Sequence, residues 1–454
     1  AAGTTVSSGA TLVLGSGTFT TSEGLTLSGQ GVGGNGALRN LDNDHTLSGN
    51  IALAAETYVG VQGGTTLTAS GVISGTGFGL TKLDTGTLVL SGANTYTGTT
   101  AISAGQLTLS GAGNLGTSAT PTTIASGATL ALSNLSAASG ENITVTGAGL
   151  GGLGAIRSIA GTNTISGNVT LNGNTTIGAF GSGLVLTGNI TNATTGSYAL
   201  VKTGDGDLTL SGTANTYTGS TTVRNGSLSV TTNAPVSANG ALGNSGSVVQ
   251  LGDAGTAASN NLALLISNST GGVNLDRSIS VNNFNTSGTS TLGGTNTSGT
   301  NTFAGNLGLG RDTTLVAAAG GTVAFNGALS GAGPVTAGNA TSTGSVLLAG
   351  NNTYTGATTV AYGTLVAANA GALGTTDAGT TIASGATLAL QGNITVAAGE
   401  SLTVSGTGAG GIGAIENRSG DNTFAGPVTL AGNTTLGATA GTLTLSGALA
   451  ESGG

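Results

Sequence analysis

The sequence predicts an all-β fold in which the chain winds as a β-solenoid of about 20 residues per coil. Three observations support this fold class. Short stretches carry an aliphatic side chain at every second position, these stretches recur at a nearly regular spacing, and Gly, Asn and Ser stand where they end. Alternation with period two is typical of strands. A short repeated unit made only of strands and turns is typical of one solenoid coil.

The short repeat is visible as equivalent aliphatic positions in successive stretches. The matched pairs are Leu88 with Leu107, Leu208 with Leu228, and Val346 with Leu365. We expect successive coils to pair their strands in parallel, so that each aliphatic side chain stacks on its counterpart in the next coil. This phase predicts that Leu88, Leu90, Leu208 and Leu210 point inward and that Thr209 points outward.

Composition indicates a narrow core and excludes several functional classes. Of 454 residues, 88 are Gly, charged residues make up 5% and aromatic residues 3%. Gly adopts the positive φ angles that tight corners require. The absence of Cys excludes disulfides, zinc–thiolate sites and cysteine nucleophiles. The net charge is −8 and no Lys/Arg cluster occurs, so we expect no nucleic-acid partner.

Longer repeats are marked by motifs that recur in the same order. Asn-Thr-Tyr-Thr-Gly starts at Asn94, Asn215 and Asn352, and Ser-Gly-Ala-Thr-Leu starts at Ser8, Ser126 and Ser384. We therefore expect one continuous β-solenoid over residues 1–454. Its long periods are approximately 1–118, 119–246, 247–376 and 377–454, the last incomplete, as in a fragment of a longer protein.

One motif resembles a known family. The pattern Leu-x-Lys-x-Gly-x-Gly-x-Leu-x-Leu-Ser-Gly-x-Asn-Thr-Tyr-x-Gly-x-Thr occurs, with small departures, from Leu200 to Thr221 and from Leu80 to Thr99, while the copy before Asn352 lacks the Lys. It is similar to the passenger-associated transport repeat of bacterial autotransporter passenger domains, which include adhesin-like surface proteins. The resemblance implies a right-handed parallel β-helix, an outer-membrane translocator barrel outside this chain, and an extracellular or cell-surface location on a Gram-negative bacterium.

The repeated Asn, Tyr and Gly residues are expected to be structural, with each Tyr covering a coil corner. They are Asn94, Tyr96, Gly98, Asn215, Tyr217, Gly219, Asn352, Tyr354 and Gly356. His45, the single histidine, takes the slot that Asn163, Asn301 and Asn422 occupy in other copies, so we interpret it as a turn residue rather than a catalytic base.

No residue pattern predicts a catalytic, cofactor or metal site. The closest acidic pairs are interpreted as solvated turns; they are Asp42/Asp44, Asp205/Asp207 and Glu416/Asp421. Three segments fit G-x-G-x-x-G, beginning at Gly29, Gly147 and Gly406, but they recur in phase with the repeat. A dinucleotide site would need this motif to open a helix, so they are predicted to be loops.

These observations favour an extracellular structural or adhesive scaffold without catalysis. One alternative is a self-assembling filament or matrix subunit, because neither end of the sequence resembles a polar capping repeat. Another is a β-helix enzyme that degrades polysaccharide, which needs converging carboxylates. Ice or surface binding by Thr arrays would need regular Thr-x-Thr on one face, which is not evident. The expected partners are a host or neighbouring-cell surface, its glycans, and a second copy end to end.

Overall fold

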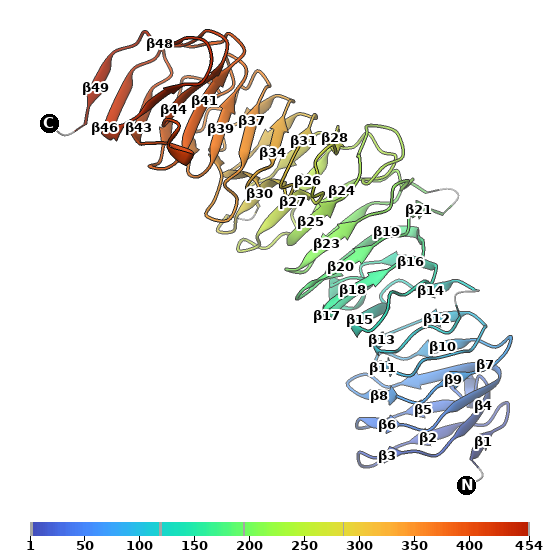
Figure 1. Cartoon of the computed structure of the whole chain (residues 1–454). Coiled ribbons are helices and arrows are strands. Elements are labelled where there is room, and N and C mark those ends of the chain that lie inside the picture. Colours follow the sequence, from blue (N-terminus) through green and yellow to red (C-terminus); the bar gives the residue numbers. More distant parts are fainter. Residues whose placement is uncertain (1–2, 118–119, 194–195, 285, 453–454) are drawn as a thin grey trace. The chain divides into compact units, whose positions relative to one another are not determined.

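The computed structural model describes residues 3–117, 120–193, 196–284 and 286–452, and divides into two compact units, Ala1–Gly219 and Ser220–Gly454. Regular structure in the described residues consists of short strands and three 3-10 turns, with no α-helix. Paired strands run parallel and stack coil on coil within each unit (Figure 1). The predicted all-β parallel solenoid is thus confirmed. No helix in these residues is long and apolar enough to cross a membrane.

In the first unit, the strands form ladders that follow the sides of the coils. One ladder holds β1 (Thr4–Val6), β4 (Leu25–Gly29), β7 (Ile51–Val61) and β9 (Ile73–Ser74). A second holds β2 (Leu12–Leu14), β5 (Leu38–Asn40), β7, β10 (Leu80–Leu83), β12 (Thr100–Ile102), β14 (Thr122–Ile124), β16 (Ile143–Gly147), β19 (Val169–Ala179) and β21 (Ile190–Asn192). A third holds β3 (Thr20–Thr21), β6 (His45–Leu47), β8 (Thr66–Ala69), β11 (Thr87–Leu90), β13 (Gln106–Gly111), β15 (Thr129–Leu135), β17 (Ile156–Ala160), β19 and β22 (Leu200–Thr203). The last holds β18 (Thr162–Ile165), β20 (Gly183–Leu186) and β23 (Asp207–Leu210).

The second unit repeats this arrangement. Its first ladder holds β24 (Thr221–Val223), β26 (Val249–Leu251), β29 (Ile279–Val281), β32 (Leu307–Leu309) and β35 (Leu329–Gly331). The longest holds β25 (Gly226–Val230), β27 (Leu262–Ile266), β30 (Ser290–Gly294), β33 (Thr313–Ala317), β36 (Val335–Ala337), β38 (Thr358–Val360), β40 (Thr380–Ile382), β43 (Leu402–Gly406), β46 (Val428–Thr434) and β49 (Leu449–Glu451). A third holds β28 (Asn274–Leu275), β31 (Thr300–Phe303), β34 (Thr322–Phe325), β37 (Ser345–Leu348), β39 (Thr364–Ala367), β41 (Thr387–Gln391), β44 (Ile415–Ser419) and β47 (Leu436–Ala438). A short one holds β42 (Thr395–Val396), β45 (Asn422–Phe424) and β48 (Leu443–Leu445).

Coil length varies because extra residues are added at the corners. Leu88 pairs with Leu107, and Leu107 in turn pairs with Leu130, so the second of these two coils is the longer one. In the second unit, Gly226 pairs with Leu262, which makes that coil longer still. The predicted length of about 20 residues per coil therefore describes the shortest coils, and the loops absorb the difference.

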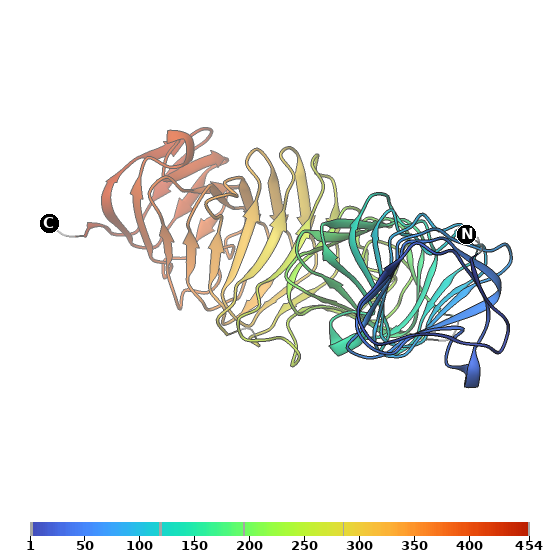
Figure 2. The same ribbon diagram turned by 90° about the horizontal axis from the view of Figure 1, so that it is seen from below.

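The core is a stack of aliphatic side chains enclosed by the coils. Figure 2 shows the coils of the first unit, blue to green, with their strands arranged around a common interior. As predicted, Leu88, Leu90, Leu208 and Leu210 are at most 2% exposed, whereas Thr209 is only half-buried. Removing such apolar surface from water contributes about 25 cal/mol per Å², so a coil is stable only when it is stacked on its neighbours.

A single column of threonines lies on the outer side of the longest ladder of the second unit. Pairing aligns Thr291, Thr314, Thr336, Thr359, Thr381, Thr403 and Thr429, all half-buried or exposed. Residues beside them point inward, as Val335 and Ala337 do beside Thr336. The sequence did not suggest this column, because unequal coil lengths hide the register. Each strand contributes one outward threonine to this column, so the column is one threonine wide and differs from the Thr-x-Thr pattern.

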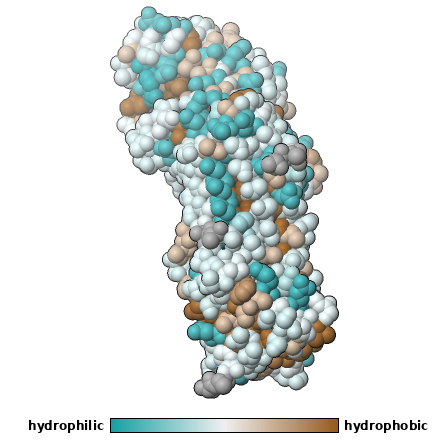
Figure 3. All heavy atoms as spheres, turned by 90° about the vertical axis from the view of Figure 1, so that its right-hand side faces the viewer, coloured by the Kyte–Doolittle hydropathy of each residue, from teal (hydrophilic) through white to brown (hydrophobic). Residues whose placement is uncertain are grey.

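The outer surface shows no broad apolar area on the face displayed in Figure 3. Pale and teal spheres cover most of that face, and brown spheres form small separate patches. Exposed aliphatic side chains include Val32, Leu153 and Ile412, which lie in corresponding loops of three copies.

Candidate functional site

Each Asn of the Asn-Thr-Tyr-Thr-Gly motif is buried and binds the backbone of the preceding coil. The bonds run from Ile73 N to Asn94 Oδ1 (2.9 Å), from Ile190 N to Asn215 Oδ1 (2.7 Å) and from Leu329 N to Asn352 Oδ1 (2.9 Å). In the first and third copies the amide nitrogen also donates to the following coil, at Asn114 (2.8 Å) and Ala372 (2.6 Å). The amide thus satisfies backbone groups at a corner where the strand ladder is interrupted.

The three motif tyrosines lie inside the fold. Tyr96, Tyr217 and Tyr354 are each 0% exposed. The hydroxyl of Tyr96 lies 2.6 Å from Thr100 Oγ1, and that of Tyr354 lies 2.6 Å from Thr358 Oγ1. Burial raises the pKa of Tyr96 and of Tyr354, only partly offset by these hydrogen bonds. A ligand at the surface could not contact these rings.

Each motif Gly is required by the close approach of another backbone. An added Cβ would lie 2.2 Å from Phe78 C at Gly98, 2.2 Å from Tyr198 C at Gly219 and 2.4 Å from Pro334 N at Gly356. Real Cβ atoms essentially never come within 3.0 Å of a heavy atom outside their own residue and its chain neighbours. Any side chain would therefore push two stacked coils apart.

The motif lysines are buried, which the sequence analysis did not anticipate. Lys82 and Lys202 are 0% exposed. Lys82 Nζ donates to the carbonyls of Leu83 (2.6 Å), Asp84 (2.7 Å) and Ala104 (3.3 Å), and Lys202 Nζ donates to those of Thr203 (2.9 Å) and Gly204 (2.6 Å). Burial lowers the pKa of Lys82 to about 8 and that of Lys202 to about 7, and nearby aspartates oppose this effect. Both lysines stand at inward positions of the strand alternation, and this pattern was the signal from which their burial could have been predicted.

Two buried glutamates were also missed. Glu141 and Glu400 are 4% and 2% exposed. Glu141 Oε1 accepts a hydrogen bond from Thr122 Oγ1 (3.1 Å), and Glu400 Oε1 accepts one from Thr380 Oγ1 (2.8 Å). Burial raises the pKa of each carboxyl to about 7, with the threonine bond acting in the opposite direction. The two glutamates occupy equivalent positions in two copies of the repeat. Thr122 pairs with Ile143 and Thr380 pairs with Leu402, and each glutamate stands two residues before that paired residue.

Arg277 takes the corresponding position in the copy between them. It stands two residues before Ile279, which pairs with Val249 instead of a threonine. The side chain is 1% exposed and donates to the carbonyls of Leu242 (Nη1, 3.0 Å) and Ser247 (Nε, 3.1 Å). One corner of the repeat thus accommodates either a carboxyl group or a guanidinium, provided that each finds a hydrogen-bonding partner.

His45 is not in a turn, contrary to the sequence interpretation. It begins β6 and is 1% exposed, with Nδ1 2.5 Å from Asn40 Oδ1 and Nε2 2.8 Å from the Gly17 carbonyl. The asparagines in its slot are buried too, and each accepts from an earlier coil. These bonds join Leu135 N to Asn163, Val273 N to Asn301, and Ile394 N to Asn422. The position occupied by His45 or Asn is therefore an inward polar one. Histidine and asparagine can both occupy it, because both side chains can form hydrogen bonds between neighbouring coils.

The carboxylates of the acidic pairs accept hydrogen bonds from neighbouring amides and hydroxyls. Backbone amides bind Asp42 (from Ser16, 2.8 Å), Asp44 (from Thr66, 2.6 Å), Asp205 (from Gly181, 3.4 Å) and Asp421 (from Thr442, 2.9 Å). Hydroxyls bind Asp207 (from Thr209, 2.7 Å) and Glu416 (from Thr439, 2.8 Å). Among the described residues, no group of three or more His, Cys, Asp or Glu side chains could hold a metal ion.

The three glycine-rich segments form one repeated turn. They contain η1 (Val32–Gly34), η2 (Leu150–Gly152) and η3 (Ala409–Gly411), whose middle glycines have φ of 63°, 63° and 62°. Strands β5, β17 and β44 follow them. They are loops of the repeat as predicted, and none opens the helix that a dinucleotide site requires.

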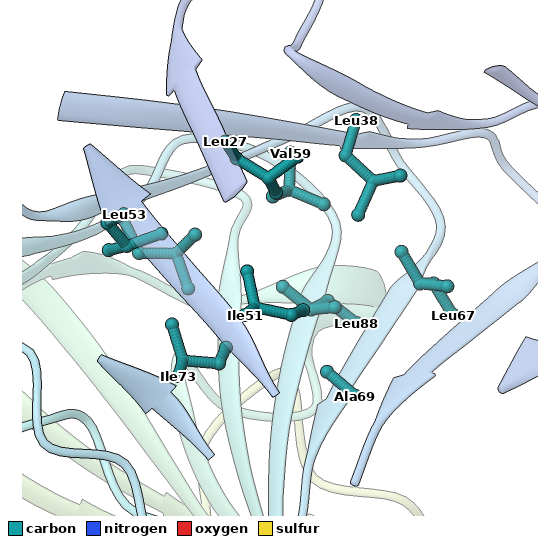
Figure 4. Close-up of a pocket in the computed structure, with 10 residues that line it drawn as sticks. Leu27, Leu38, Ile51, Leu53, Val59, Leu67, Ala69, Ile73 and Leu88 are labelled. Carbon is teal, nitrogen blue, oxygen red and sulfur yellow. The ribbon is translucent and has the colours of Figure 1, made fainter. Parts of the chain in front are cut away.

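Figure 4 shows an interior gap of the first unit. The side chains of Leu27, Leu38, Ile51, Leu67 and Leu88 point toward one another around it. The gap measures only about 10 Å³, which is about the smallest space that holds one water molecule. It is part of the packed core and not a ligand site.

Comparison with known proteins identifies the repeat. Residues 80–109, 200–230 and 340–367 match the family model described as passenger-associated-transport-repeat. The adhesin BmaC autotransporter of Brucella suis biovar 1 is 36% identical over 165 residues, which cover 36% of this chain and 4% of that protein. This chain therefore spans a small part of that relative's length. No solved structure matches the chain. The matches support an autotransporter passenger domain with a cell-surface or extracellular location, in agreement with the sequence motif.

Proposed function

We propose that this autotransporter passenger domain is an extracellular structural and adhesive scaffold, displayed on or released from the surface of a Gram-negative bacterium. The observation that carries the proposal is the burial of the repeated motif. In all three copies its Asn and Tyr side chains lie inside the coils, and its Gly lies against another backbone. A repeat whose chemistry is directed inward maintains a scaffold and leaves the outer faces free to vary.

Catalysis is not part of this proposal. A β-helix glycosidase needs two carboxyl groups facing one substrate, about 5–10 Å apart. Here the paired acids accept hydrogen bonds from neighbouring backbone amides and hydroxyls. That arrangement supports a role in shaping turns. The similar Brucella protein is named an adhesin, which supports attachment as the role of the scaffold.

The proposed partners follow from the same resemblance. An outer-membrane translocator from the same precursor would carry the passenger across the membrane, and a host or neighbouring-cell surface would be bound. The long periods, 1–118, 119–246, 247–376 and 377–454, are proposed to be copies of one scaffold unit. The matched positions of Glu141 and Glu400, and of His45, Asn163 and Asn422, support this division.

Adhesion can be tested with beads coated with the purified chain. Wild-type beads should attach to cultured host cells in a saturable manner, and free protein should compete with them. The Leu208→Asp variant, which places a carboxylate in the core, should attach poorly because its coils are disrupted. Attachment that equals that of uncoated beads would refute the adhesive role. Release of reducing sugar from a panel of polysaccharides would refute the non-catalytic role.

A further inference from the structure

A surface groove of about 530 Å³ lies beside η1 in the first unit. Gln30, just before η1, and Glu56 and Tyr58, both on β7, supply its larger polar side chains. Ser8 and Gly29 form part of its lining. Gln30 and Glu56 are exposed, Tyr58 is half-buried, and Gln30 Nε2 lies 3.4 Å from the Tyr58 hydroxyl. An aromatic side chain, an amide and a carboxylate therefore meet in one open groove.

The same backbone recurs in two other copies with different side chains. The glycines preceding η1 and η2 have nearly identical angles, φ 72° and ψ near 180°. Strand pairing sets the equivalent positions, since β4 pairs with β7, β16 with β19 and β43 with β46 in the same bulged register. The equivalent residues are Gln30, Ala148 and Thr407; Glu56, Asn174 and Asn433; and Tyr58, Thr176 and Thr435.

This internal comparison separates folding from function. Small residues occupy these positions in the second and third copies, so the turn and the strand form without Gln, Glu or Tyr. Asn174 even serves the backbone directly, because its Oδ1 accepts from Ala199 N (2.9 Å). The three larger side chains of the first copy are therefore not needed to build the scaffold, and they gather at the groove.

We propose that this groove binds a neutral sugar unit of a surface glycan. The Tyr58 ring offers an apolar face beside a polar hydroxyl, which suits the mixed faces of a sugar ring. The Glu56 carboxylate accepts hydrogen bonds from hydroxyls, and the Gln30 amide both donates and accepts. A few convergent polar groups around an aromatic surface are typical of small-ligand sites.

Charge and shape decide which ligand class fits best. No Lys, Arg or His is among the residues that line the groove, so an acidic sugar or a phosphate would meet Glu56 without a compensating cation. A cation could face Glu56 and Tyr58, but a single aromatic ring does not enclose it. The open groove buries only part of a ligand, so we expect a dissociation constant on the order of 1 mM.

Saturation-transfer NMR with the full chain tests the proposal. The probes are methyl glycosides of glucose, galactose and N-acetylglucosamine, with sialic acid and choline as charged comparators. We expect binding of at least one neutral glycoside and at least tenfold weaker binding to Tyr58→Thr and to Gln30→Thr/Glu56→Asn. These variants carry the residues of the third copy, so their circular dichroism should match the wild type. Thr407→Ala, in the third copy, is the matched control and should bind as the wild type does.

The results separate this site from the adhesive scaffold on which its biological role rests. Absence of any neutral-sugar binding, unchanged binding by the Tyr58→Thr variant, or tighter binding of choline or sialic acid would each overturn the groove proposal. If no sugar binds but coated beads still attach to cells, the adhesive function stands and the groove does not. If sugar binds and the beads do not attach, the groove stands and the adhesive function fails.

Discussion

The buried glutamates should make the solenoid more stable in mild acid than in mild alkali. Burial raises the pKa of Glu141 and of Glu400 to about 7, from an ordinary value of 4.5. A raised folded-state pKa means that the folded chain binds the proton more tightly than the unfolded chain. The contribution is therefore fully present below pH 4.5 and is lost as the pH rises through 7. Glu141→Gln and Glu400→Gln should remove this dependence, because an amide stays neutral.

The size of the effect follows from the shift. The rise of the pKa from 4.5 to about 7 corresponds to at most about 3 kcal/mol per site, since each pKa unit is worth about 1.36 kcal/mol. Solvent screening and relaxation around the charged form reduce this limit, so we expect about 1–2 kcal/mol per site between pH 5 and pH 8. The hydrogen bond from Thr122 is kept in the Glu141→Gln variant, because the amide oxygen accepts it.

Urea unfolding followed by far-ultraviolet circular dichroism, at five values between pH 5 and pH 9, measures this contribution. The difference between wild type and Glu141→Gln should favour the wild type at pH 5 relative to pH 8. Glu23→Gln, at an exposed acid of the same unit that also accepts a hydrogen bond from a threonine (Thr4 Oγ1, 2.6 Å), is the control for the loss of one carboxylate. If Glu141→Gln and wild type lose or gain stability in parallel over the whole range, the glutamate is not neutral in the folded chain and the reasoning fails.

The glutamate contribution must be measured as the difference between wild type and Glu141→Gln, because the buried lysines change the stability with pH in the opposite direction. The lowered pKa of Lys82 and Lys202 means that their contribution is present above pH 10.5 and is lost as the pH falls through about 8 and 7. The wild-type profile is the sum of both effects. Lys202→Met should accordingly remove the loss of stability that occurs as the pH falls from 10.5 to about 7, whereas Glu141→Gln removes the loss that occurs as the pH rises from 4.5 to about 7.

Three further predictions concern the packing of the coils. Leu208→Asp should destabilise the first unit by several kcal/mol, because it buries an unpaired carboxylate. Thr209→Asn, on the outer face, should change the urea midpoint little. Equal loss of stability in both variants would show that the strand phase is misassigned. Gly98→Ala should lower the stability by about 1–3 kcal/mol through overpacking. Gly15→Ala, whose Cβ would meet only Asp42 at 3.6 Å, should change the stability by no more than about 0.5 kcal/mol. Thermal unfolding compares the two variants, and similar melting temperatures would contradict the close approach at Gly98. Tyr96→Phe should cost about 1 kcal/mol by removing the hydrogen bond between the Tyr96 and Thr100 hydroxyls, while Thr100 keeps its bond to the Leu115 carbonyl. A urea midpoint equal to that of the wild type would contradict a contribution from the Tyr96 bond.

The fold could be predicted from the sequence because its determinants are local and repeated. Alternation placed Leu88 and Leu208 inside, and the spacing of Leu88 and Leu107 identified their pairing directly. Coil length was predictable only where corners are short. Between Gly226 and Leu262 the added residues form loops, and nothing in a periodic pattern indicates where an irregular corner ends.

The interior polar groups were harder to predict, since rules based on residue type assign them to the surface. His45 was interpreted as a turn residue because asparagine takes its place elsewhere, and asparagine is common in turns. In the structure both residues are buried donors or acceptors between coils. Position in the repeat identified the slot correctly, but residue preference gave the wrong environment. The groove beside η1 was not predictable either, because Gln30 and Tyr58 are far apart in the sequence and meet only through coil stacking.

The burial of the basic side chains has one physical cause, which lies in the corners of the coils. A ladder strand satisfies its carbonyls with the amides of the next coil, but a corner turns its carbonyls away from that ladder. Lys82 donates to three such carbonyls and Arg277 to two. An unpaired buried carbonyl costs about 1–3 kcal/mol, so several donors on one side chain offset much of the cost of burying its charge. A basic residue in the inward phase of a strand that runs directly into Gly or Asp is therefore the sequence sign of a corner that needs a donor.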